Sequence, residues 1–145
     1  MDRIDNLHFY EVDWSTSAHS IMAVRHKVFI IEQRFNHKML KDRHDPYCHH
    51  ILVSNQQGEA IGSGRLNQDG RIGRIAVLMN YRGLGVGTRI LSELIKIAQQ
   101  SHIPRLSLNA ETDLSHFYDQ QNFSADGPVY MKQGVPYQRM TKRLA

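Results

Sequence analysis

One segment, residues 71–101, constrains the fold of this chain more than any other. Residues 72–79 are apolar except for one arginine, a pattern that predicts a strand buried on both faces. From Ile90 onward the apolar residues recur at helical spacing, which predicts a helix. Between the two elements lie three closely spaced glycines, Gly83, Gly85 and Gly87. The segment therefore predicts a strand, a glycine-rich turn and a helix in direct succession.

This turn has the features of a site for a phosphate group. Glycine has no Cβ, so the backbone can approach a ligand closely. A helix that begins at the turn directs its free N–H groups and the positive end of its dipole toward it, and phosphate is the usual ligand there. Arg82 and Arg89 flank the helix start, and no carboxylate precedes Glu93, although acidic residues are common in a first helical turn. We therefore expect an external anion at this turn.

Three known types of glycine-rich loop differ in the residues and the glycine spacing that they require. A Walker-type loop requires a lysine after the glycines, and none is present. The dinucleotide fingerprint requires a different glycine spacing, and only about 45 residues follow the helix, too few for the remaining parallel strands of that fold. The third pattern, Arg/Gln-x-x-Gly-x-Gly/Ala, is matched by Arg82, Gly85 and Gly87. It resembles the acetyl-coenzyme A pyrophosphate loop of the GNAT superfamily of N-acyltransferases. A turn that only connects the two elements is the remaining alternative.

The rest of the chain supplies further predicted elements. We expect strands over 7–13, 48–54, 59–67, 105–110, 123–131 and 136–142, a helix capped by Ser15 or Ser17 and ending near Gln33, and a short helix capped by Thr112 and ended by a left-handed Asn122. Residues 34–47 predict an irregular loop or a short helical turn. Turns at 55–58 and 67–70 imply antiparallel pairing of the second to fourth strands. The strand over 105–110 should lie parallel to the central strand, because a helix connects them.

The element order β-α-β-β-β-α-β-α-β-β indicates an α+β fold with a mixed sheet. It is also the order of the GNAT fold, a resemblance that implies a central mixed β-sheet of about six or seven strands flanked by three or four helices. At 145 residues the chain is expected to form a single domain over 1–145.

Separate motifs extend the resemblance along the chain. Asn109-Ala110, Phe117-Tyr118 and Asn122-Phe123 resemble the superfamily's Asn/Ala…Phe-Tyr…Gly-Phe segment, with asparagine where glycine is usual. Three further motifs are similar to an ElaA-like subgroup: Arg25-x-x-Val28-Phe29-x-x-Glu32-Gln33, Asp42-x-x-Asp45 with His50, and Gly134-Val-Pro-x-x-x-Met140. That subgroup commonly has histidine where this chain has Tyr137.

The resemblance implies direct transfer of an acetyl group from acetyl-coenzyme A to a primary amine of a small molecule or to an exposed amino group, including one on a peptide. It also implies the residues that bind the coenzyme: Ile75, Ala76, Val77, Arg82, Gly83, Leu84, Gly85, Val86, Gly87, Thr88, Asn109, Phe117 and Tyr118. The alternative is a non-catalytic module that binds or senses acyl-coenzyme A.

The reaction sets three chemical requirements. The amine must lose a proton, since free alkyl amines have a pKa near 10; Glu32 is the first candidate for the base and Asp45 the second. Backbone N–H groups around Ala76-Val77 can stabilise charge on the thioester oxygen. By resemblance, Tyr118 protonates the departing thiolate. Each of these side chains can instead have a purely structural role, Tyr118 in the core and Glu32 at the exposed end of its helix. Asp42 and Asp45 can also form an acidic lip, that is, negative charge at the entrance of the site that attracts a cationic acceptor.

The composition of the chain and the spacing of its residues argue against several other functions. No apolar run reaches the length of about 20 residues that a membrane span needs, and basic residues are too scattered for a nucleic-acid surface. His37, His44, His49 and His50 match no zinc spacing, so no metal is expected. Cys48 is the only cysteine, which fits a reducing, cytoplasmic setting. The sequence is compatible with a homodimer but does not specify the oligomeric state.

Overall fold

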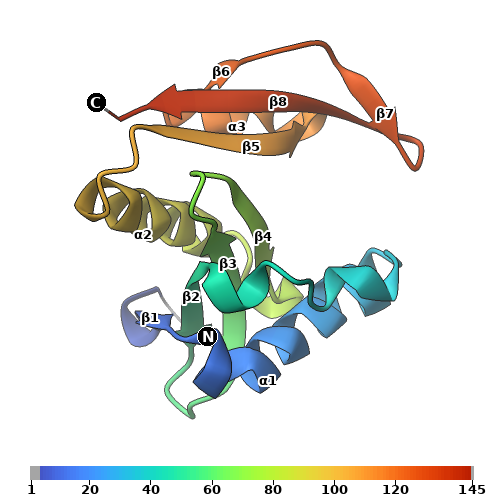
Figure 1. The fold of residues 1–145 in the computed structure, drawn as a ribbon. Coiled ribbons are helices and arrows are strands. Elements are labelled where there is room, and N and C mark those ends of the chain that lie inside the picture. Colours follow the sequence, from blue (N-terminus) through green and yellow to red (C-terminus); the bar gives the residue numbers. More distant parts are fainter. Residues whose placement is uncertain (1–3, 145) are drawn as a thin grey trace.

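The computed structural model describes residues 4–144 (Figure 1). Within this range the chain forms eight strands and three α-helices: β1 (His8–Val12), α1 (Trp14–Arg25), β2 (His49–Ser54), β3 (Ala60–Leu66), β4 (Ile72–Val77), α2 (Val86–Gln100), β5 (Arg105–Glu111), α3 (Ser115–Gln120), β6 (Ser124–Ala125), β7 (Tyr130–Lys132) and β8 (Val135–Arg143). The predicted α+β class is confirmed.

The strands form two sheets that meet at one place. Strands β1, β2, β3 and β4 pair in that order and antiparallel, while β8 pairs antiparallel with β5, β6 and β7. A single isolated bridge in the described part of the chain, parallel between Arg71 and Ser107, connects the sheets, and the Ser107 N–H donates to the Gly70 carbonyl at 2.9 Å. The predicted parallel direction is therefore correct, but the sheets diverge beyond this bridge (Figure 1).

The helices that flank the first sheet pack against it through two separate clusters of buried apolar residues. On α2, Ile90, Leu91 and Leu94 are completely buried, and burial of such a side chain contributes about 1.5–3 kcal/mol. A Cβ on Gly64 of β3 would lie 2.7 Å from Ile90, so glycine allows α2 to pack closely on the sheet. On α1 and the segment after it, Val24, Val28 and Phe29 pack with Ala76 of β4.

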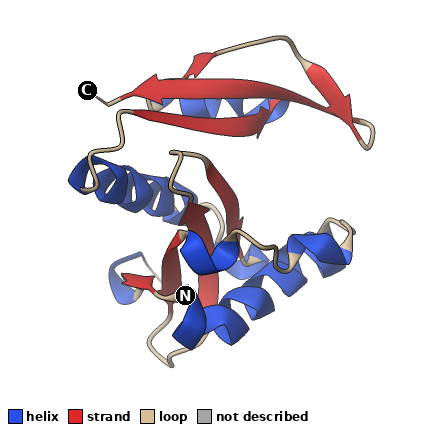
Figure 2. Ribbon diagram, viewed as in Figure 1, coloured by secondary structure: helices blue, strands red, loops and turns tan. Residues whose placement is uncertain are grey.

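Helix α3 covers the second sheet, behind β5 and β8 in Figure 2. Its Phe117 and Tyr118 pack against the main core. Asn122 follows it with a φ of +68°, the left-handed conformation that was predicted. The predicted cap is wrong, because α3 begins at Ser115, whose hydroxyl donates to the Thr112 carbonyl in a preceding 3₁₀ turn.

Two other predictions differ from the structure. Helix α1 begins at Trp14 after Asp13, so neither Ser15 nor Ser17 is at the N-cap position. It continues over His26–Glu32 as a wider π-helix, in which the Gln33 N–H donates to the carbonyl of Val28 five residues earlier. The strand predicted over 123–131 is interrupted, because the chain leaves β8 between β6 and β7, around a Gly127 with φ of +125°.

No helix within residues 4–144 has both the length and the apolar character needed to cross a membrane.

Candidate active site

Strand β4 contains a bulge where the two sheets separate. Arg65 pairs with Gly73 and Ser63 pairs with Ala76, so two residues, Arg74 and Ile75, oppose the single Gly64. Arg74 has a φ of +54°, which is uncommon for a residue with a side chain. A bulge bends the strand and leaves the backbone groups of the extra residue unpaired. Strand β4 is therefore bent where the space between the sheets opens, and the backbone of its extra residue is unpaired in the ladder.

Two cavities lie on either side of this bulge. The loop cavity, about 500 Å³, extends along β4 to the glycine turn, and the cleft cavity, about 490 Å³, lies between the two sheets. Gln33, Ile75 and Leu114 line both. Because Ile75 is part of the bulge, a ligand extending from one cavity into the other passes the free backbone of β4.

The loop cavity ends at the start of α2. The helix begins at Val86, earlier than the periodicity of its apolar residues indicates, and its N-cap is Gly85 with a φ of +85°. No side chain within residues 4–144 caps this end, and its first turn has no acidic residue. A Cβ placed on Gly83 or Gly87 would meet no atom within 4 Å. The free N–H groups of α2 are therefore available to an anion in an open turn.

Arg82 is held beside this turn by two partners. Its guanidinium donates to the Val77 carbonyl at 3.0 and 2.9 Å and forms a two-contact ion pair with Glu32. The hydrogen bond from Arg82 lowers the pKa of Glu32 below its ordinary value. Glu32 lines neither cavity, so the structure brings this predicted base to an arginine and not to the cleft.

Most of the predicted coenzyme-binding residues line the loop cavity: Ile75, Ala76, Val77, Arg82, Gly83, Gly85, Val86, Gly87, Thr88 and Phe117. Asn109 and Tyr118 line the cleft cavity instead. Leu84 lines neither cavity, because it packs against the main core. The glycine segment and strand β4 thus line the loop cavity together with Phe117 of α3, whereas residues of β5 and Tyr118 of α3 line the cleft cavity.

Tyr118 reaches the cleft cavity from α3. Its ring packs edge-on against Phe117 at 5.0 Å and Phe123 at 6.1 Å between ring centroids. Burial, with a smaller contribution from the negative charge of Glu111, raises the pKa of Tyr118 above its ordinary value. The phenol therefore remains protonated at neutral pH and can act as an acid.

Glu111, the last residue of β5, is a cleft residue that the sequence analysis did not assign. Its carboxylate forms no ion pair or hydrogen bond within residues 4–144, whereas Asp42, the other carboxylate lining the cleft, is bound by both terminal nitrogens of Arg65 at 2.8 Å. One signal was present in the sequence. Alternation along β5 places Glu111 on the same face as Asn109, opposite the buried Leu106, Leu108 and Ala110.

Asp45, the second predicted base, is completely buried and lines neither cavity. Arg25 binds both of its oxygens at 3.0 Å, and Arg65 donates to it at 2.9 Å. Burial opposes ionisation of Asp45, but hydrogen bonds from Arg25 and from the Asp42 backbone outweigh it, so the pKa is lowered. Because Asp42 and Asp45 are both paired with arginines, they do not form an acidic lip.

The described residues contain no group of three or more His, Cys, Asp or Glu side chains placed to share a metal ion. The absence of a metal stays a prediction.

Comparison with known proteins places these features in a family. Residues 17–144 match the model of the acetyltransferase (GNAT) domain. Protein YyaT of Bacillus subtilis is 29% identical over 133 residues, covering 88% of this chain and 89% of YyaT. The uncharacterized N-acetyltransferase YjcF of the same organism is 29% identical over 123 residues, covering 82% and 87% of the two chains. The crystal structure of Escherichia coli ElaA has the same fold, with a TM-score of 0.85 at 22% identity over 94% of this chain and 99% of ElaA.

Proposed function

Because the chain belongs to the GNAT acetyltransferase family, we propose that it transfers an acetyl group from acetyl-coenzyme A to a primary amine of a small molecule or to an exposed amino group. One observation carries the proposal. A cavity that ends at an uncapped helix N-terminus meets a second cavity, which contains a free carboxylate and a protonated phenol, at a bulge with unpaired backbone groups. The remaining steps follow from the chemistry of the groups in these two cavities.

The loop cavity fits the phosphate-bearing part of the coenzyme. The free N–H groups at the start of α2, together with Arg82, would bind the pyrophosphate. The open space at the Cβ positions of Gly83 and Gly87 leaves room for it. The extended remainder of the molecule would follow β4, and its thioester would then lie at the bulge near Ile75.

We assign the groups that the reaction needs to the cleft cavity. Glu111 would accept the proton that the amine must lose, directly or through a water molecule, so that the nitrogen can attack the thioester carbon. A backbone N–H at the bulge would stabilise the charge on the thioester oxygen. As the carbon–sulfur bond breaks, the Tyr118 hydroxyl would donate its proton to the sulfur, and the Tyr118 oxygen would regain a proton, through water, from the nitrogen that becomes the amide.

The test is coenzyme A release from acetyl-coenzyme A across a panel of amines, with two variants in the cleft. General acid–base groups typically contribute 10²–10⁴-fold, so Glu111→Gln and Tyr118→Phe should each lower kcat by roughly that factor and leave the affinity for coenzyme A, measured by calorimetry, nearly unchanged. Glu59→Gln is the matched control, because Glu59 is exposed and lines neither cavity.

Two results would contradict the proposal. If both folded variants retain turnover within about twofold of wild type when chemistry limits the rate, Glu111 and Tyr118 do not have these roles. If the wild-type protein binds acetyl-coenzyme A tightly but acetylates no amine in the panel, the chain is a non-catalytic acyl-coenzyme A binding module.

A further inference from the structure

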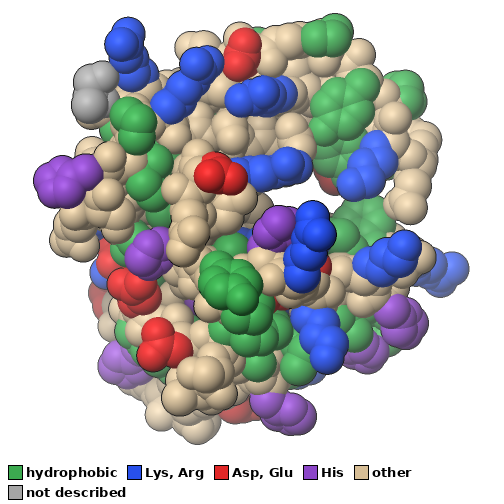
Figure 3. All heavy atoms as spheres, viewed as in Figure 1, with side chains coloured by type: hydrophobic (Ala, Val, Ile, Leu, Met, Phe, Trp, Pro, Cys, Tyr) green, Lys and Arg blue, Asp and Glu red, His purple; other side chains and the backbone are tan. Residues whose placement is uncertain are grey.

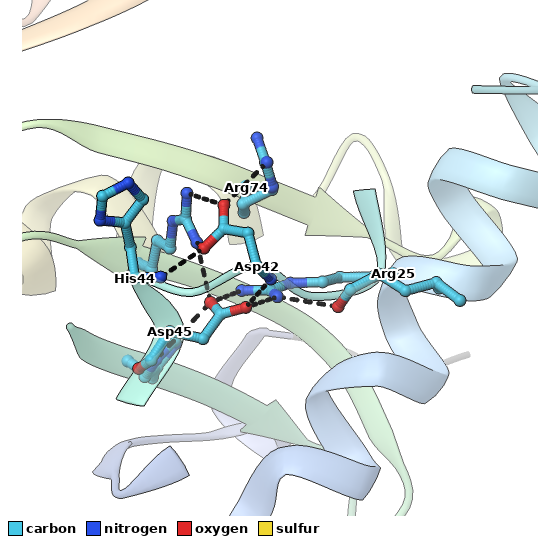
Figure 4. A network of polar contacts seen from close by, with 8 residues as sticks. Arg25, Asp42, His44, Asp45 and Arg74 are labelled. Atoms are coloured by element: carbon cyan, nitrogen blue, oxygen red, sulfur yellow. Dashed lines mark hydrogen bonds and ion pairs between the residues drawn. The ribbon is translucent and has the colours of Figure 1, made fainter. Parts of the chain in front are cut away.

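A chain of alternating charges runs from the interior of the protein to the cleft cavity (Figure 4). Arg25 binds both oxygens of Asp45 at 3.0 Å, and Asp45 accepts from Arg65 at 2.9 Å. Arg65 binds both oxygens of Asp42 at 2.8 Å, and Asp42 accepts from Arg74 at 3.2 Å. Three guanidinium groups thus share two carboxylates, which leaves one positive charge without a counterpart. We call these five residues the charge network.

The excess charge lies at the cleft end of the network, on Arg74. Arg25 is completely buried and Arg65 makes three contacts with carboxylate oxygens, whereas Arg74 makes one contact and lines the cavity. Within residues 4–144 neither Nε nor Nη1 of Arg74 has a hydrogen-bond partner, and since Nε is buried, Nη1 is the donor left for a ligand. Burial, followed by the positive charge of Arg65, lowers the pKa of Arg74, because its single contact with Asp42 does not compensate. Arg74 therefore has unused capacity to bind an anion.

The backbone at Arg74 is strained, because its φ is positive. A residue with a side chain in the left-handed region is strained, and such strain concentrates at functional sites. Arg74 adopts it because the bulge inserts an extra residue opposite Gly64. Glycine would relieve the strain at this position.

Other side chains make the same end of the cavity basic. Arg71, just before β4, and Lys132 of β7 also line it, and neither forms an ion pair within residues 4–144. Figure 3 shows the hollow between the two halves of the molecule with Lys and Arg side chains on both sides of its mouth. Among the residues that the structure describes, two acidic side chains line the cavity: Asp42, which is already paired, and Glu111. A purely cationic acceptor such as a diamine would meet repulsion here.

We propose that the acceptor is an amine that also carries an oxyanion, a carboxylate or a phosphate, and that Arg74 binds this oxyanion as the next member of the charge network. The inference rests on the proposed function and names the substrate class of the same site. Arg74 would hold the anionic end of the acceptor with Arg71 and Lys132 nearby, while Glu111 remains free for the amine. The planar guanidinium of Arg74 has a single contact within residues 4–144, through one Nη2 N–H, and its fork of donors matches the geometry of such a ligand.

The experiment compares acceptors in matched pairs at saturating acetyl-coenzyme A. One arm sets ω-amino carboxylates of increasing chain length against their amides, and the other sets phosphoethanolamine against ethanolamine. Wild type should have a kcat/KM at least about 100-fold higher for the anionic member of one arm, because a close charge pair of this kind strengthens binding by at least that factor. The arm with this preference also identifies the oxyanion.

Arg74→Gly should abolish that preference by lowering kcat/KM for the anionic acceptor about 100-fold and leaving the neutral one within about threefold. This variant also relieves the backbone strain at φ of +54°, so misfolding is not the expected cause. Arg74→Lys should restore part of the preference, because it keeps the charge but not the planar fork. Arg139→Gly is the control, because Arg139 is an exposed arginine on β8 that lines neither cavity.

The other possible outcomes distinguish failure of this inference from failure of the proposed function. Turnover with a preference for neutral or cationic amines, or an anionic preference that survives Arg74→Gly, overturns the inference while the proposed function stands. If no amine is acetylated, the proposed function fails, and calorimetry of the same carboxylates and phosphates with the protein decides the anion site separately. In that case, binding that Arg74→Gly abolishes supports the inference, and binding that is absent or unaffected by the substitution overturns it.

Discussion

The loop cavity takes most of its wall from one continuous segment, residues 75–88, whereas the cleft cavity is assembled from 29–44, 65–75, 108–118 and 130–137. The loop cavity offers mainly backbone groups to a ligand, in particular the N–H groups of a helix whose first turn has no acid. The cleft cavity offers side chains whose positions depend on ion pairs between distant elements. Substitutions in the loop cavity should therefore change only the affinity for coenzyme A, whereas substitutions in the charge network behind the cleft should lower the free energy of unfolding.

Asp45→Asn should have the largest effect, on stability. The substitution leaves the completely buried Arg25 without its charged partner, which typically costs about 3–5 kcal/mol of unfolding free energy. Chemical denaturation measures this, with Asp69→Asn as control because Asp69 lies exposed in a turn. A loss below about 1 kcal/mol would show that the cleft does not depend on the network.

The stability of the same variant should also depend on pH differently from that of wild type. Arg65 lowers the pKa of Asp42, and the hydrogen bonds described above lower that of Asp45, so each group stabilises the fold above its unfolded pKa of about 4. This stabilisation is lost as the pH falls through the lowered folded values, because both carboxylates then become protonated. The difference between wild type and Asp45→Asn should therefore be full at pH 7 and shrink below about pH 4.

Gly85→Glu should have the next largest effect, on coenzyme A binding. It places bulk and negative charge at the uncapped start of α2, and a like charge against the pyrophosphate should weaken binding by at least about 100-fold. Gly58→Glu is a matched control, because Gly58 also has a positive φ, +80° against +85°, and open space around its Cβ position, but lines neither cavity. Calorimetry that finds equal affinity in the two folded variants would contradict the assignment of the loop cavity.

Glu32→Gln should have the smallest effect and tests the remaining role of Glu32. Its pair with Arg82 is exposed, and such pairs contribute about 0–1 kcal/mol. Because the substitution frees Arg82 for the pyrophosphate, coenzyme A should bind up to about fivefold more tightly and turnover should stay within about twofold. Glu93→Gln is the control, since Glu93 pairs with Arg89 and Lys96 on α2 and not with Arg82. If the substitution instead slows turnover about 100-fold, Glu32 is the base.

Local sequence rules were sufficient for the secondary structure around the loop cavity. The change from an apolar run to helical spacing, with glycines between, predicts β4, the turn and α2, because strand burial, helical amphipathicity and glycine conformation each depend on neighbouring residues. The left-handed Asn122 and the antiparallel order of β2, β3 and β4 follow from similarly local signals.

Only the tertiary structure decided which charges are free. Glu32 is separated from Arg82 by 50 residues and Asp45 from Arg25 by 20, so no local pattern indicates that both carboxylates are paired. Glu111 differs from them in lining the cleft and in lacking such a partner within residues 4–144, and Arg74 lines the cleft with a single carboxylate contact at the point where β4 bulges opposite Gly64. The reactivity of an ionisable side chain depends on burial and on charges within a few ångströms, and the packing of distant segments sets both.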